Sequence, residues 1–194
     1  MQSDVIELLG RAASATEAVL GQLGPSCSGN PTPCPEMTVN QVAAHLIGGI
    51  RGLRAVAEGE ALTWDAELDP DLGGRSTAAV FRADVDALLR SYAVPGRLDT
   101  DFAMPWGPAS GAQLMGFELI EVVVHGWDVA KGLGVDLPVD DDVVTATLAG
   151  ARMWVDDSVR VPGMFGAEVA VSDAGPLDEL VAFLGRDPRW PDRR

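Results

Sequence analysis

Two histidines supply all the imidazole groups of this chain of 194 residues. His45 lies in the helix-like run that begins Thr38-Val-Asn-Gln, and His125 lies in the segment Glu121-Val-Val-Val-His125-Gly-Trp-Asp128. Glu121 and His125 are four residues apart, so they share one face of a helix. Two imidazoles and one carboxylate are sufficient protein ligands for a catalytic zinc ion whose fourth position is open. A metal site at His45, Glu121 and His125 requires that the fold bring the three side chains together.

The helix that carries His125 has its ionisable residues in a narrow stripe. Glu118, Glu121, His125 and Asp128 follow one another at spacings of three and four residues. Such a stripe is typical of the solvated face of an amphipathic helix. However, most of the other residues between 114 and 129 are apolar, and a polar stripe on a buried helix must find partners. His45 has a similar alternative, because a lone histidine on an apolar face is often a hydrogen-bonded core residue.

Apolar spacing predicts five helices to position these groups. They cover residues 3–23, 38–59, 76 to the Pro95-Gly96 stop, 110–131, and a stretch within 140–155. Thr38 and Gln41 match a capping box at the start of the second helix, and Gly132 is expected just after the fourth.

Shorter elements are expected around these helices. Residues 98–107 are expected to form a short hairpin or an extended loop. Residues 165–172 should be extended, and 177–184 should form a short helix closed by Gly185. Because long helices dominate, the predicted fold is mainly all-α, an up-and-down bundle whose ligand sites lie between facing helices.

Composition excludes some partners. The net charge of −15 opposes nucleic acid and anionic membranes, since phosphates require basic side chains. No signal peptide and no apolar run long enough to span a bilayer are recognised. Cys27 and Cys34 lie in a Gly/Pro/Ser-rich loop and are expected to be free thiols in a reducing cytoplasm. We expect one cytoplasmic domain over residues 1–194, and a homodimer remains open.

The segments around His45 and Glu121 to Asp128 resemble the metal-binding domain of the mycothiol-dependent maleylpyruvate isomerases. That domain belongs to the broader DinB-like superfamily of four-helix metalloproteins. Pro31-Thr-Pro-Cys-Pro-Glu-Met-Thr-Val is similar to the family's Pro-Thr-Pro-Cys-x-x-Trp-x-Val segment. Phe165-Gly and the stretch 180–190 resemble the end of its small single-domain branch, so the resemblance covers nearly the whole chain.

The resemblance implies a DinB-like four-helix bundle in which His45, Glu121 and His125 bind a divalent metal, usually zinc. Two departures limit what carries over. Met37 stands where the family segment usually has tryptophan. The isomerases also carry a C-terminal domain that contributes to their active site, and this chain is expected to be too short to hold one. Metal binding therefore carries over better than maleylpyruvate isomerisation.

Other residues near the predicted ligands have two interpretations each. Asp128 could orient a ligating histidine or be a surface or capping carboxylate, and Glu118 could be an acid/base group or a charge on the helix rim. Trp106 and Trp127 are expected in the core rather than at a substrate. The remaining candidates are Cys34, for which the sequence supplies no mechanism, and Arg51 and Arg54, which could line the entrance or be surface charges.

The leading functional expectation is a metal-dependent isomerase or S-transferase with a small-molecule substrate and mycothiol as cosubstrate. An open metal position would bind the thiol, lower its pKa and present a thiolate to an electrophile. Two alternatives remain open: a hydrolase or lyase that uses metal-bound water, and a non-catalytic metal-binding protein. Two histidines and a carboxylate also suit Fe, Ni, Mn or Co.

Overall fold

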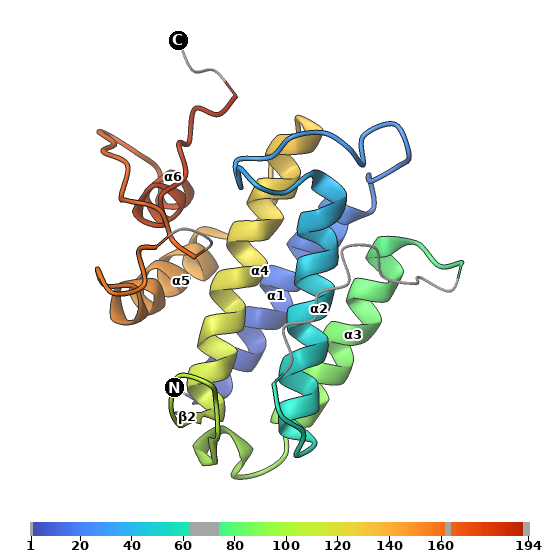
Figure 1. Cartoon of the computed structure of the whole chain (residues 1–194), viewed down its shortest axis with the longest axis vertical. Coiled ribbons are helices and arrows are strands. Elements are labelled where there is room, and N and C mark those ends of the chain that lie inside the picture. Colours follow the sequence, from blue (N-terminus) through green and yellow to red (C-terminus); the bar gives the residue numbers. More distant parts are fainter. Residues whose placement is uncertain (1, 63–73, 162–163, 192–194) are drawn as a thin grey trace.

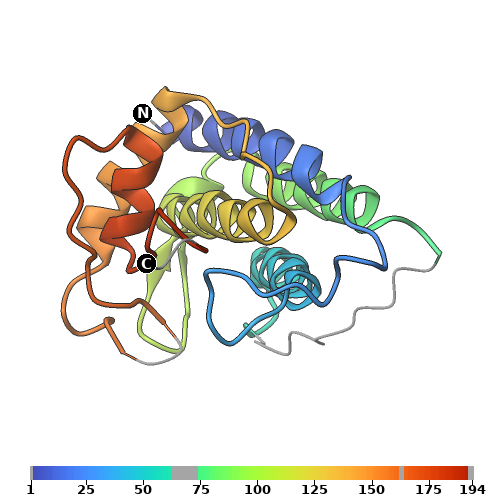
Figure 2. The same cartoon turned by 90° about the horizontal axis from the view of Figure 1, so that it is seen from above.

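Four long helices form the centre of the molecule, which the computed structural model describes for residues 2–62, 74–161 and 164–191 (Figure 1). Seen from above, two shorter helices lie beside this bundle, next to its last helix (Figure 2). The helices are α1 (Gln2–Leu20), α2 (Val39–Ala57), α3 (Thr77–Tyr92), α4 (Gly111–Leu133), α5 (Asp141–Trp154) and α6 (Pro176–Phe183). The prediction of a mainly α-helical bundle with a small C-terminal helix is confirmed.

The four long helices do not alternate strictly in direction. α4 packs against α1 and α2, and α3 packs against the same two helices. α1 and α4 run one way while α2 and α3 run the other, so the order is up, down, down, up (Figure 1). Parallel neighbours need a connection that returns along the bundle, and the long Asp/Gly-rich stretch between Ala57 and Thr77 supplies its length. The two helices that carry the predicted ligands, α2 and α4, are antiparallel neighbours.

Capping boxes fix the starts of both ligand-bearing helices. The Thr38 backbone N–H donates to the Gln41 side chain at 2.9 Å, and the Thr38 hydroxyl accepts from the Gln41 N–H. Ser110 and Gln113 form the same arrangement at the start of α4, with 2.8 Å between Ser110 N and the Gln113 side-chain oxygen. These bonds satisfy N–H groups that lack partners within the helix. The capping box predicted at Thr38 is confirmed.

The predicted end of α4 was wrong by two residues. Gly134, with φ of 72°, terminates the helix in the left-handed conformation that glycine adopts easily. Gly132 is instead inside α4 and buried. A Cβ at Gly132 would lie 3.0 Å from the Pro31 carbonyl oxygen, so glycine is needed there for close packing against the loop before α2.

Short elements connect the helices. A 3-10 turn, η1 (Arg97–Asp99), precedes β1 (Asp101–Phe102), which pairs antiparallel with β2 (Ala109–Ser110). Of the hairpin and the extended loop left open for residues 98–107, the hairpin is present, but its second strand, β2, lies beyond that range and leads directly into α4. Residues 165–172 form no strand in the described structure. The predicted Gly185 turn after α6 is present, with φ of 86°.

The bundle interior is apolar and closes tightly around α4. Thr16 on α1 is fully buried and donates to the Val122 carbonyl oxygen at 3.0 Å. Gly126 faces Thr16 so closely that any side chain there would collide with it. Burial of most of α4 rules out the solvated-stripe interpretation. Within the described ranges, no helix combines the length and apolar character needed to cross a bilayer.

Candidate metal centre

His45, Glu121 and His125 meet between α2 and α4. Glu121 Oε2 lies 3.2 Å from His45 Nε2 and 3.3 Å from His125 Nε2. The two imidazole rings are edge-on to each other, with centroids 4.9 Å apart. The candidate ligand atoms of all three residues lie within 4.8 Å of one another. One ion could therefore contact all three.

The spacing and charge of the cluster fit a divalent metal. Two ligands at metal distances of 2.0–2.1 Å around a tetrahedral ion are about 3.3 Å apart, which matches the distances from Glu121 Oε2 to both imidazole nitrogens. Three carboxylates, Glu118, Glu121 and Asp128, are buried or half-buried around the cluster, and among the described residues Arg186 is the one buried guanidinium near them. A divalent ion would balance the two remaining negative charges, since unpaired buried charge is costly.

Asp128 holds the far side of His125. Its Oδ2 accepts a hydrogen bond from His125 Nδ1 at 2.9 Å, and its side chain is fully buried. In the neutral ring, a proton on Nδ1 would leave Nε2, the nitrogen on the Glu121 side, with the lone pair that a metal needs. The surface interpretation of Asp128 is therefore wrong, and its geometry is that of a residue that orients a ligating histidine. Arg186 Nη2 reaches the same Asp128 oxygen at 3.2 Å.

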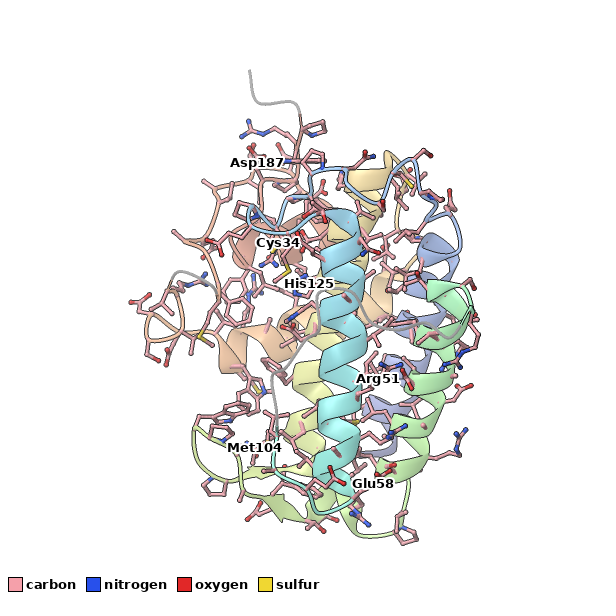
Figure 3. The ribbon with its side chains drawn as sticks, turned by 45° about the vertical axis from the view of Figure 1, so that its right-hand side comes forward. Cys34, Arg51, Glu58, Met104, His125 and Asp187 are labelled. Atoms are coloured by element: carbon pink, nitrogen blue, oxygen red, sulfur yellow. The ribbon has the colours of Figure 1, made fainter. Side chains whose placement is uncertain are left out.

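Cys34 lies behind the cluster rather than in it. Its sulfur, His125 and Asp128 form a second group of close polar atoms, and Cys34 and His125 lie near each other in Figure 3. Burial, and then the charge of Asp128, raises the pKa of the Cys34 thiol to about 11. The thiol is therefore protonated at neutral pH and is a poor nucleophile.

A small pocket opens beside the cluster, between α2 and α4. It is lined by His45, Leu46, Gly49, Leu53, Phe117, Glu118 and Glu121. Glu118 is 2% exposed, and its Oε1 has no hydrogen-bond partner among the described residues. Gly49 of α2 faces this carboxyl, since a Cβ there would be in ordinary van der Waals contact with Glu118 Oε2, at 3.9 Å. Glu118 is thus a buried carboxyl at the pocket rather than a charge on the helix rim.

The electrostatics of the cluster favour proton uptake when no metal is bound. Burial, and then the charge of Glu121, raises the pKa of Glu118 to about 8. Burial lowers the pKa of His125, but hydrogen bonds to Asp128 and Glu121 outweigh this and raise it to about 9. Burial raises the pKa of Glu121, yet hydrogen bonds from His125 and His45 bring it well below its usual range. Two protons, one on Glu118 and one on His125, can therefore balance the negative charge of the buried carboxylates when no metal is bound.

The two arginines proposed for the site entrance do not line the pocket. Arg51 Nε donates to Asp84 Oδ2 on α3 at 2.7 Å, and Arg54 lies 3.6 Å from Glu58. In Figure 3, Arg51 lies closer to the C-terminal end of α2 than His125 of α4 does.

The two tryptophans differ from each other in burial. Trp127 is buried as expected, with Lys131 over its ring. Trp106 is 51% exposed in the hairpin loop, so its core assignment was wrong. The Trp106 ring lies 6.5 Å from that of Phe117, a pocket residue.

The sequence patterns did not indicate Arg186, Leu53 or Phe117 as site residues. Only Arg186 had a usable signal, because a carboxylate on an otherwise apolar helix requires a cation or hydrogen-bond donor. The pocket-lining residues look like ordinary core positions.

A helical bundle with a His/Glu/His cluster between two antiparallel helices is typical of helical-bundle metalloproteins. The chain belongs to the family described as the mycothiol maleylpyruvate isomerase N-terminal domain, whose model matches residues 9–130. This family is a DinB-like, metal-binding one, and its matched residues contain all three predicted ligands.

Two curated proteins are similar to the chain along most of its length. They are uncharacterized proteins of Mycobacterium tuberculosis, from strain CDC 1551 / Oshkosh and strain ATCC 25618 / H37Rv. Each is 30% identical over 182 residues, which cover 92% of this chain and 96% of the relative. No solved structure matches the chain significantly.

Proposed function

We propose that this protein is a metal-dependent enzyme that uses a small thiol, mycothiol, to attack a small electrophile in an isomerisation or S-transfer reaction. The observation that carries this proposal is the position of Glu121 Oε2 between two imidazole nitrogens, 3.2 and 3.3 Å away, beside a pocket. Three protein ligands leave a coordination position for an external group. Family membership supplies the thiol as the expected occupant of that position.

The residues around the cluster have distinct roles in this proposal. A divalent metal, most often zinc, would supply a Lewis acid that lowers the pKa of a bound thiol. Asp128 keeps the His125 ring oriented through Nδ1. Glu118, a buried carboxyl that lines the pocket, can accept a proton there and return it. Leu46, Leu53 and Phe117 exclude water from one side of the reacting groups.

Metal content tests the ligand set. We expect about one zinc per chain for the wild-type protein, as for other three-ligand sites, and little in His45→Ala or His125→Ala. Glu121→Gln keeps the shape of the side chain but loses its charge, and should also bind zinc weakly. Glu7→Gln, at an exposed position of α1, is the matched control and should bind zinc normally. Full zinc content in both histidine variants would show that the ligand assignment is wrong.

Calorimetric titration with mycothiol separates the proposed reaction from its alternatives. The zinc-loaded protein should bind the thiol, and the zinc-free protein should not. Thiol-independent turnover of hydrolysable substrates would favour the hydrolase or lyase alternative. Tight zinc binding with no affinity for any thiol, and no turnover, would favour a binding protein.

A further inference from the structure

Arg186 connects the C-terminal segment to the cluster, although it lies outside residues 9–130, which the family model matches. Its Nη2 is 3.2 Å from Asp128 Oδ2, the oxygen that also accepts from His125 Nδ1 at 2.9 Å. Asp128 is fully buried and Arg186 is 8% exposed. A continuous chain of polar contacts therefore runs from the C-terminal segment through Asp128 and His125 to Glu121.

The backbone holds Arg186 in a fixed position. Its N–H donates to the Val181 carbonyl oxygen at 2.9 Å, and its Nη1 donates to the Leu184 carbonyl oxygen at 3.1 Å. Gly185 makes the turn with a positive φ, and a Cβ there would lie 2.8 Å from the Gly166 nitrogen. Leu184 and Val181 have no exposed surface. The segment that carries Arg186 is thus a packed part of the molecule.

Because the Arg186–Asp128 ion pair is buried, loss of one partner should be destabilising. A solvated ion pair contributes little to stability, but loss of one partner from a buried pair leaves an uncompensated charge. Without Arg186, Asp128 would have His125 as its only charged partner among the described residues. Asp128 would then be drawn away from its present orientation, and the ring of His125 would lose the contact that directs Nε2 at Glu121.

We propose that Arg186 is a positioning residue of the metal centre and makes the C-terminal segment, residues 164–191, a structural part of that centre. The proposal rests on the metal site described under the proposed function. Arg186 holds Asp128, Asp128 holds His125, and His125 presents Nε2 to the metal. Because coupling of binding free energies is reciprocal, a metal at the cluster must also stabilise the docked C-terminal segment.

Zinc affinity tests one direction of this coupling. Competition with a chromophoric chelator should show zinc binding weakened about 10- to 100-fold in Arg186→Met, the usual effect of losing a residue that supports a metal ligand. Arg186→Lys keeps the charge and should recover part of the loss. Arg189→Met is the matched control, because Arg189 lies on the same segment, pairs with Asp187 and is 76% exposed at its side chain. It should bind zinc like the wild type.

Hydrogen exchange tests the other direction. Amides of residues 176–186 should exchange more slowly in the wild-type protein when zinc is added, and zinc should have no such effect in His45→Ala. This measurement needs no variant of Arg186, so the coupling between zinc and the C-terminal segment can be tested even if Arg186→Met fails to fold. Unchanged exchange in a protein that binds zinc, or equal zinc affinity of wild type and a folded Arg186→Met, would overturn this inference alone. Absence of zinc binding by the wild type would instead overturn the proposed metal site.

Discussion

At the level of single residues, the buried charges around Glu121 make proton binding and metal binding compete. Glu118 and His125 have raised pKa values of about 8 and about 9, so both are largely protonated at neutral pH in the metal-free protein. A divalent ion bound at the cluster would supply the same positive charge. The chemistry of the site should therefore depend on pH even before any substrate is present.

We predict that the metal-free protein loses stability as pH rises from about 6.5 to 9. The pKa of His125 is 6.5 in the unfolded chain and about 9 in the folded one. Its stabilising contribution to the free energy of unfolding is therefore complete below pH 6.5 and lost as pH rises through 9. Glu118 changes stability in the same direction as pH rises, because its folded pKa of about 8 exceeds its unfolded value of 4.5. Melting temperatures of chelator-treated protein at pH 6, 7.5 and 9 provide the measurement. Glu118→Gln should show a smaller decrease, and a melting temperature that rises across this range would contradict the assignment.

Zinc binding should also release protons, because metal ligands must be deprotonated. At pH 7 we expect the release of about one proton per zinc from the proposed ligand His125, whose pKa is about 9. Glu118 is not one of the proposed ligands, but the charge of a nearby ion favours its ionised form, so its proton, held with a pKa of about 8, should add up to one more. Calorimetry in buffers with different ionisation enthalpies measures this number directly. Zinc binding without proton release at pH 7 would mean that these groups are not protonated in the metal-free site.

The meeting of His45, Glu121 and His125 could be predicted from sequence, because histidine is rare in this chain and Glu121 and His125 have helical spacing. The chain has two histidines, and Glu121 is one helical turn from the second. Arg186 could not be assigned in the same way. Its contact with Asp128 depends on how α5 and α6 pack beside α4, and no local spacing records that arrangement.

At the level of helices, close approach of α1 to α4 positions the His125 segment. Gly126 follows His125 directly and faces Thr16, so the two helices are held at a separation that only glycine permits. The starts of α2 and α4 were predictable from hydroxyl and glutamine caps, which are local signals. The end of α4 was not, because Gly132 and Gly134 look alike in sequence, and only packing against Pro31 distinguishes them.

We predict that Gly126→Ala destabilises the protein, by about 1–3 kcal/mol for overpacking, partly offset by up to about 1 kcal/mol of helix propensity. It should also weaken zinc binding by displacing His125. Gly116→Ala on the same helix is the matched control, since nothing lies within 4 Å of a Cβ there. That substitution should stabilise the protein by about 0.5–1 kcal/mol. Urea unfolding curves compare the two, and equal effects would show that α1 and α4 are not held by this contact.

At the level of the whole molecule, the C-terminal helices share the core of the bundle. Val143 and Leu148 of α5 and Leu180 of α6 belong to one continuous cluster of buried apolar residues with α1–α4. At the surface, Arg11 of α1 also pairs with Asp140 and Asp142 at the start of α5, at 2.6 to 2.8 Å. These contacts join the segment beyond residue 130 to the part that the family model matches.

We therefore predict that the chain unfolds in one cooperative transition, as a single domain over residues 1–194 would. Scanning calorimetry should give a van't Hoff enthalpy equal to the calorimetric enthalpy. The comparison should be made in excess chelator, because partial metal occupancy would broaden the transition. Two resolved transitions would show that α5 and α6 form a unit of their own.

The location of both histidines at the cluster has a practical consequence for spectroscopy. The chain has two imidazoles, and both lie against the same carboxylate oxygen. The histidine ring C–H resonances in a proton NMR spectrum therefore report on the candidate metal centre alone, because the chain has no other histidines. The tautomer and protonation state of each ring, and which nitrogen a metal takes, can be followed in the wild-type protein once a single His45 variant has assigned the two signals.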